Sequence, residues 1–196
     1  EKRWRYPESG TIGRLTSSVS IGDDGTIYVG STNISGTASV YAFTADGNLK
    51  WRFPVEENRI VATPAIGRDG TVYVGALNWG LVHNADLSRR GHLYAINDQV
   101  ESASLKWKFE VEGGLNAAPV IDARENLYFG TYSDQMIVDE ILQAGGYHLY
   151  ALSADNEELW SYPLPGRVQA PPALGDGTVY VGTTQTDARL YAFEEP

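Results

Sequence analysis

The chain repeats one structural unit four times in succession, and this repetition constrains the fold more than any other feature of the sequence. Every unit holds a Tyr-(Val/Phe)-Gly tripeptide, a Tyr-Ala pair and a Trp-x-(Phe/Tyr) element. The tripeptide occupies residues 28–30, 73–75, 128–130 and 180–182, so successive copies are 45, 55 and 52 residues apart. Because the landmarks recur in a fixed order, we expect four similar units that bury their apolar faces against one another.

Each unit is predicted to form four short antiparallel strands. In the first unit these strands are expected at residues 17–21, 26–31, 39–44 and 49–55. Asp24-Gly25 separates the first two strands, and this dipeptide favours a tight hairpin because glycine accepts a positive φ. The same dipeptide recurs in the second and fourth units, and helical periodicity is nearly absent. The fold class is therefore predicted to be all-β.

The distribution of apolar residues favours a β-propeller over a two-layer sandwich. Second strands such as Val72-Tyr73-Val74 are apolar on both faces, which requires cover on both sides. Last strands such as Lys50-Trp51-Arg52-Phe53 alternate, as expected for an outer strand with one face in solvent. We predict one domain, residues 1–196, of four four-stranded antiparallel blades at approximately 17–55, 62–111, 117–164 and 170–193 plus 2–7.

The blade sequences resemble a known repeat. Gly-Thr-Val-Tyr-Val-Gly, Leu-Tyr-Ala and Leu-Lys-Trp-(Arg/Lys)-Phe are similar to the PQQ-like repeat of quinoprotein propellers, and the resemblance covers all 196 residues. That family includes quinone-dependent dehydrogenases and non-enzymatic outer-membrane assembly factors. The dehydrogenases use a Ca²⁺ site, a catalytic Asp and often a vicinal Cys pair, but this chain has no Cys and no motif that matches the metal or catalytic positions. The resemblance therefore implies a propeller for which no cofactor is predicted.

The ends of the chain raise the question of how the ring closes. The sequence begins with an outer-strand motif around Trp4, and its last unit ends after a third strand. Residues 2–7 are therefore expected to complete the last blade, because this removes an unpaired edge. Three arrangements satisfy the expectation: a four-bladed ring within one chain, a homodimer of two chains that forms an eight-bladed ring, and one half of a longer chain.

Composition excludes several partners and sites. The chain has 15 Lys and Arg against 25 Asp and Glu, a net charge of −10, so a nucleic-acid partner is not expected. The lack of Cys excludes disulfides and thiolate metal sites. No apolar run approaches the roughly 18 residues of a membrane span, and no signal peptide is present in the sequence. A periplasmic, extracellular or cell-surface location is the expectation that the family resemblance carries.

Variable loops mark the face where binding is expected. In a propeller, the connections between blades share one face with the loops between second and third strands. Here those loops differ in length and comprise residues 32–38, 77–91, 132–147 and 184–187. Long loops on a rigid scaffold commonly carry binding sites. Within the third loop, an apolar stripe predicts a short helix that would act as a lid, formed by Met136, Ile137, Ile141 and Leu142.

Arginine recurs at one position of the blade-to-blade connections. Arg14, Arg59 and Arg167 are equivalent when the units are aligned, and the third unit has Gly114 there. Guanidinium groups clustered near a propeller axis suit carboxylates and phosphates, which predicts an anion or acidic-segment site. In the alternative, each arginine is a structural residue that pairs with a nearby acid such as Asp134, Asp139 or Asp187.

The candidate ligand-binding residues extend beyond the arginines. Residues two positions further along each connection are expected to line the same funnel, and they are Thr16, Val61, Asn116 and Gln169. The variable loops add candidates of their own. The full set of predicted ligand-binding residues is Arg14, Arg59, Arg167, Asn116, Gln169, Asn78, Trp79 and Tyr132.

Two functions from different classes remain. The first is a non-catalytic binding or scaffold propeller that takes a protein or a small anionic ligand at the loop-rich face. The second is part of a quinone-dependent dehydrogenase or another enzyme, which would require PQQ and Ca²⁺. No nucleophile, phosphate-loop, dinucleotide or zinc-protease motif is present, and His92 and His148 lie one repeat apart, too far for a shared metal. The first function is favoured.

Overall fold

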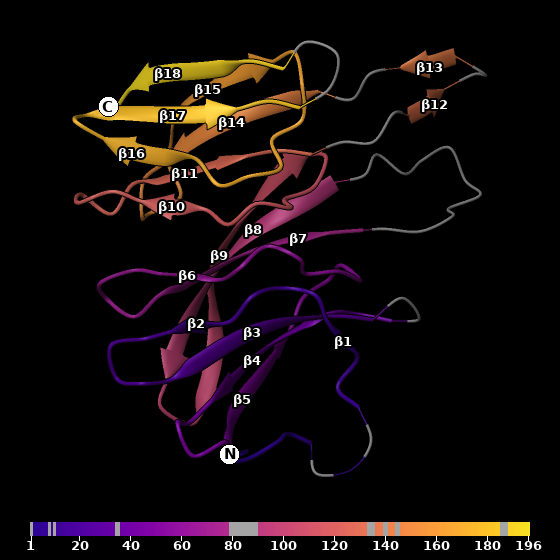
Figure 1. Cartoon of the computed structure of the whole chain (residues 1–196), viewed down its shortest axis with the longest axis vertical. Helices are drawn as coiled ribbons and strands as arrows, with labels where there is room; N and C mark the ends of the chain where they lie inside the picture. The colour runs from indigo at the N-terminus through magenta and orange to yellow at the C-terminus, as the bar shows by residue number, and fades with distance from the viewer. Residues whose placement is uncertain are drawn as a thin grey trace.

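The computed structural model consists of four antiparallel sheets that follow one another from the N-terminal end of the molecule to the C-terminal end (Figure 1). It describes residues 2–7, 9, 11–33, 36–78, 90–132, 136–138, 141–143, 146–184 and 188–196. Every regular element in these ranges is a strand, and none of them contains a helix that could span a membrane. The predicted all-β propeller of four-stranded antiparallel blades is confirmed as the fold class.

Each sheet is built from consecutive antiparallel strands. The first sheet contains β2 (Ser20–Ile21), β3 (Ile27–Thr32), β4 (Ser39–Phe43) and β5 (Leu49–Pro54), and β1 (Arg14–Leu15) also pairs with β3. The second contains β6 (Ala65–Ile66), β7 (Val72–Leu77), β8 (Arg90–Gln99) and β9 (Ser102–Glu112). The third contains β10 (Val120–Ile121), β11 (Leu127–Gly130), β14 (Tyr147–Leu152) and β15 (Glu158–Leu164). The fourth contains β16 (Ala173–Gly175), β17 (Thr178–Gly182) and β18 (Leu190–Glu194).

The hydrophobic core lies between neighbouring sheets. One cluster joins Tyr28 and Trp51 of the first sheet to Val74 of the second, and two further clusters join the second sheet to the third and the third to the fourth. Strand β7 is buried along its whole length, as its continuous apolar sequence predicts. The sheets are therefore stacked blades that cover one another's faces.

The glycine of each Tyr-(Val/Phe)-Gly tripeptide explains why the tripeptide recurs. A Cβ at Gly30 would lie 2.1 Å from Ile60, and one at Gly130 would lie 2.3 Å from Val168. Both partners are fully buried apolar residues of the connection into the next blade. Glycine is required here because the next blade occupies the space where a side chain would stand.

Outer-strand tryptophans of the first and second blades donate hydrogen bonds to the following blade. The indole Nε1 of Trp51 donates to Oδ1 of Asp98 at 2.8 Å, and that of Trp107 donates to the carbonyl of Ala154 at 2.9 Å. Asp98 lies near the end of β8, the third strand of the second blade, and Ala154 lies in the turn that follows β14, the third strand of the third blade. The recurring tryptophans Trp51 and Trp107 of the outer strands thus contact the following blade.

One of the three arrangements for ring closure, the four-bladed ring within one chain, and one expected loop element differ from the structure. Residues 2–7 lie on the first sheet, where the ring centroids of Tyr6 and Phe43 are 4.9 Å apart, while β18 lies at the opposite end of the molecule (Figure 1). The ring is therefore not closed within the chain. The third variable loop holds the hairpin β12 (Met136–Val138) and β13 (Ile141–Gln143) in place of the predicted short helix. Its β-branched residues and two-residue connection favour a hairpin.

Aspartates that accept hydrogen bonds fix the first hairpin turns of three blades, and they make stability depend on pH. Burial raises the pKa of Asp122, but hydrogen bonds from Asn126, Arg124 and Tyr128 outweigh it and hold that pKa below its ordinary value of 3.8. Burial also raises the pKa of Asp69, but hydrogen bonds from Thr71 outweigh it and hold that pKa below its ordinary value. A carboxylate with a lowered folded pKa stabilises the protein above its unfolded pKa, and this contribution is lost as pH falls through the folded value.

We therefore expect the chain to lose stability as the pH falls below about 4. Asp122→Asn should lower the free energy of unfolding by about 1 kcal/mol at pH 7 and make its decline at acid pH shallower. Urea titrations between pH 7 and pH 3 measure both effects, with Asp46→Asn, in an exposed turn, as the control. An acid decline equally steep in wild type and Asp122→Asn contradicts the assignment.

Candidate functional site

The segment that enters the first blade and the three connections between blades run in equivalent positions and lie beside the variable loops. Backbone bridges join Arg14 to Thr32, Arg59 to Leu77, Gly114 to Tyr132 and Arg167 to Thr184. In each bridge, the second residue stands at the end of a second strand or directly after it, where the loop to the third strand begins. The connections and the loops therefore share one face of the molecule.

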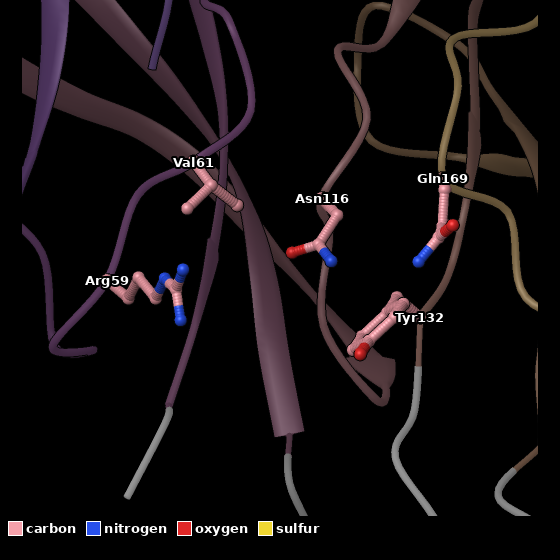
Figure 2. A pocket seen from close by; sticks show the side chains of 5 residues that line it. All are labelled: Arg59, Val61, Asn116, Tyr132 and Gln169. Carbon is pink, nitrogen blue, oxygen red and sulfur yellow. The ribbon is translucent and has the colours of Figure 1, made fainter. Parts of the chain in front are cut away.

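A pocket of about 420 Å³ opens on this face between the second, third and fourth blades. Its lining residues are Arg59, Val61, Asn116, Tyr132 and Gln169. Arg59 and Val61 come from the connection into the second blade, Asn116 and Gln169 from the next two connections, and Tyr132 from the residues after β11. Figure 2 shows Arg59 on one side, Tyr132 and Gln169 on the other, and Asn116 between them.

A second arginine supports the wall of the pocket. Arg167 donates from Nη1 to the hydroxyl of Tyr132 at 3.2 Å, and its guanidinium carbon lies 4.9 Å from the centroid of the same ring. This stacked cation–π arrangement orients the phenol and places a second positive charge behind it. Arg59 and Arg167 are both half-buried, so solvent screens their charges less than it screens surface charges.

The structure brings together four of the eight predicted ligand-binding residues in this lining, and Arg167 lies directly behind it. Arg14 is exposed in β1 and is not among the lining residues. The Oδ1 atom of Asn78 accepts a hydrogen bond from the backbone of Asn58 at 3.2 Å, which gives that side chain a structural contact. Trp79 lies outside the described residues, as do the proposed acidic partners of the arginines, Asp134, Asp139 and Asp187.

A buried polar cluster beside the second blade was not predicted from the sequence. Glu57 has an exposed fraction of only 1%, its Oε1 contacts Nδ1 of His92, and its Oε2 accepts from the hydroxyl of Tyr94 at 2.8 Å. The Tyr94 hydroxyl in turn accepts from the backbone N–H of Glu56 at 3.2 Å, and burial raises the pKa of this phenol, which keeps it protonated. These contacts of Glu57 hold the first blade-to-blade connection against β8.

The donor set of the pocket suits an anion and not a cation. A guanidinium, two carboxamides and a phenol offer N–H and O–H donors, whereas Ca²⁺ requires six to eight oxygen ligands that include carboxylates. None of the five lining residues is an acid, and no group of three or more His, Asp or Glu side chains within the described ranges could hold a metal ion. The five described lining residues therefore lack the carboxylates that a PQQ–Ca²⁺ centre would need.

Comparisons with solved structures place the fold among propellers. BamB from Moraxella catarrhalis is 17% identical with a TM-score of 0.57, and the match covers 91% of this chain and 44% of that one. The computationally designed Ika4 protein is 11% identical with a TM-score of 0.62, covering 96% and 95%. A quinohemoprotein alcohol dehydrogenase from Pseudomonas putida HK5 is 17% identical with a TM-score of 0.57, covering 87% and 29%. The chain thus spans less than half the length of the Moraxella BamB.

A sequence comparison with family models identifies the family of the chain. No curated protein matches the chain. The model described as outer membrane protein assembly factor BamB matches residues 1–139 and 89–195, which together include almost the whole sequence. The chain therefore belongs to the BamB-like family of PQQ-repeat β-propellers.

Proposed function

We propose that the chain is a non-catalytic binding module that holds an anionic group, a carboxylate or a phosphate, of a protein segment or small ligand. The observation that carries the proposal is the pocket in which Arg59, Asn116, Gln169 and Tyr132 converge on one space. Three consecutive blade connections supply Arg59, Asn116 and Gln169, and the residues after β11 supply Tyr132, so the stacked blades hold the donors in place before a ligand arrives. Such preorganisation reduces the entropic cost of binding.

The chemistry of the lining favours recognition over catalysis. A guanidinium and two amides can each donate to the oxygens of one carboxylate or phosphate, and charge-assisted hydrogen bonds are the stronger kind. None of the five described lining residues carries a carboxylate or imidazole that could act as a general base. The proposal accordingly includes neither PQQ nor Ca²⁺. It also includes an extracytoplasmic location, supported by the description of the matching family as an outer membrane assembly factor.

Replacing Arg59 tests the proposal directly. A hexaglutamate peptide and inorganic phosphate serve as probes in separate calorimetric titrations at low ionic strength. Arg59→Gln should weaken binding of the preferred probe about tenfold to a hundredfold, because one charge-assisted hydrogen bond contributes roughly 1.5–3 kcal/mol. The matched control is Arg68→Gln, which removes the same charge from a side chain that lies in the first hairpin turn of the second blade and is 75% exposed.

The two probes separate a peptide ligand from a small anion. Preference for hexaglutamate indicates an acidic protein segment, and preference for phosphate indicates a small or phosphorylated ligand. Equal weakening by Arg59→Gln and Arg68→Gln contradicts a site at the pocket, because it shows only a general effect of charge. A saturable change in tryptophan fluorescence on addition of PQQ with Ca²⁺ would favour the dehydrogenase alternative.

A further inference from the structure

The two ends of the stack expose the two halves of a single blade-to-blade interface. In the internal interfaces, Ile60, Leu115 and Val168 press on Gly30, Gly75 and Gly130 of the preceding blade. The fourth tripeptide ends in Gly182, and a Cβ there would meet nothing within 4 Å among the described residues. The fourth member of the apolar series is Leu15, which follows Arg14 as Ile60 follows Arg59. Leu15 is 51% exposed, whereas its three counterparts are all 0% exposed.

The outer-strand contacts of this interface are likewise divided between the two ends of the stack. Trp4 donates from Nε1 to the carbonyl of Ala45 at 3.0 Å, as Trp107 donates to Ala154 at 2.9 Å. Residues 2–7 therefore occupy the first blade in the way that the outer strand of a preceding blade would. At the other end, β18 has no outer neighbour in the described part of the chain, and its Leu190 is 76% exposed.

The internal blades define the register that would complete β18. Trp51 lies opposite Ala42, Trp107 opposite Ala95, and Trp160 opposite Ala151. The aromatic residue two positions later lies opposite Val40, Leu93 or Leu149, all of which are fully buried. By equivalence, Trp4 pairs with Ala192, and Tyr6 covers Leu190.

Charge at the two ends is complementary. The N-terminal segment carries Lys2, Arg3 and Arg5, although the chain as a whole has a net charge of −10. The C-terminal end of β18 carries Glu194 and is followed by Glu195. Opposite charges favour the approach of one end to the other and disfavour pairing of like ends.

We propose that two copies of this chain associate head to tail, so that residues 2–7 of each copy become the outer strand of the fourth blade of the other. Leu15 of one copy then presses on Gly182 of its partner, and Trp4 stands opposite Ala192. Two such interfaces close a two-fold ring of eight blades and remove both exposed edges. The ring also brings a second set of Arg14, Arg59 and Arg167 to the same face. This inference is independent of the proposed ligand.

The first test is the mass in solution, measured by light scattering after size exclusion. The wild-type chain should have twice its 21.4 kDa mass. Gly182→Val should yield a folded monomer, because the new Cβ meets no described residue of its own chain within 4 Å but occupies the position of the partner's Leu15. Leu15→Asp should also yield a monomer. The control is Leu105→Asp, at a similarly exposed position in β9, which should remain a dimer.

The second test fixes the register. Because the chain has no Cys, a chain with Arg5→Cys can be mixed with one carrying Tyr191→Cys and oxidised without background disulfides. Opposite residues in an antiparallel pair are close enough for a disulfide, so a covalent heterodimer should form faster than between Arg5→Cys and Ser161→Cys. A wild-type monomer, an assembly of more than two copies, or a dimer that survives both Gly182→Val and Leu15→Asp overturns the proposal.

Discussion

Gly130→Val is expected to lower the free energy of unfolding by about 3 kcal/mol or more, because the added side chain collides with the next blade. A Cβ at this position lies 2.3 Å from both Cβ and Cγ1 of Val168 and 2.5 Å from its Cγ2. Val168 is fully buried, its χ1 is restricted by β-branching, and its backbone N–H donates to the carbonyl of Thr131 at 3.2 Å. Neither residue can move away without opening the interface.

The effect can be measured by urea denaturation followed by circular dichroism. Gly182→Val is the matched control, and in the Leu15→Asp background, which removes the proposed association, it should change stability by less than about 0.5 kcal/mol. The double variant Gly130→Val, Val168→Ala should recover part of the loss, because alanine vacates the colliding methyl groups. Equal stability of Gly130→Val and wild type would show that the third and fourth blades do not pack as described.

Glu57→Ala is expected to cost about 3 kcal/mol of stability, since it removes a buried carboxylate that contacts the Tyr94 hydroxyl and the partly buried His92 ring. The Tyr94 hydroxyl loses its 2.8 Å hydrogen bond, and Nδ1 of His92 loses its carboxylate partner. Alanine also leaves a cavity between the connection and β8.

The neighbouring Glu56 gives a matched control for this variant. Its carboxylate pairs with Lys108 at 2.6 Å, but the side chain is 69% exposed, and such surface pairs contribute little. Glu56→Ala should therefore change the free energy of unfolding by less than about 1 kcal/mol in the same denaturation experiment. A loss for Glu57→Ala no larger than that for Glu56→Ala would show that the cluster does not fasten the blades.

Much of the fold could be predicted because equivalent packing positions hold the same residue types in all four repeats. Gly30 and Gly130 recur because a neighbouring blade excludes a side chain, and Trp51 and Trp107 recur because each one donates to the next blade. Alignment of the four units also places Arg59, Asn116 and Gln169 on equivalent connections, and the structure brings them to one pocket.

Features that occur once could not be predicted in this way. Glu57 contacts His92 across a blade connection, and residue spacing in the sequence does not by itself indicate that such a contact forms. The spacing of Met136 and Ile141 fits both a helical stripe and a short hairpin, so spacing alone does not identify the hairpin that the strand pairing shows. The place of residues 2–7 depends on which molecule supplies the neighbouring strand, which a single sequence does not encode.

The central functional claim is that the pocket between three blade connections binds an anionic group. The most direct test is a ¹H–¹⁵N NMR titration with hexaglutamate and phosphate that follows the side-chain amides. The account predicts saturable shifts of the Asn116 and Gln169 amide signals, with no shift for Asn48, which lies in an exposed turn. Saturable binding that leaves the Asn116 and Gln169 signals unchanged, or no binding of either probe, would contradict it.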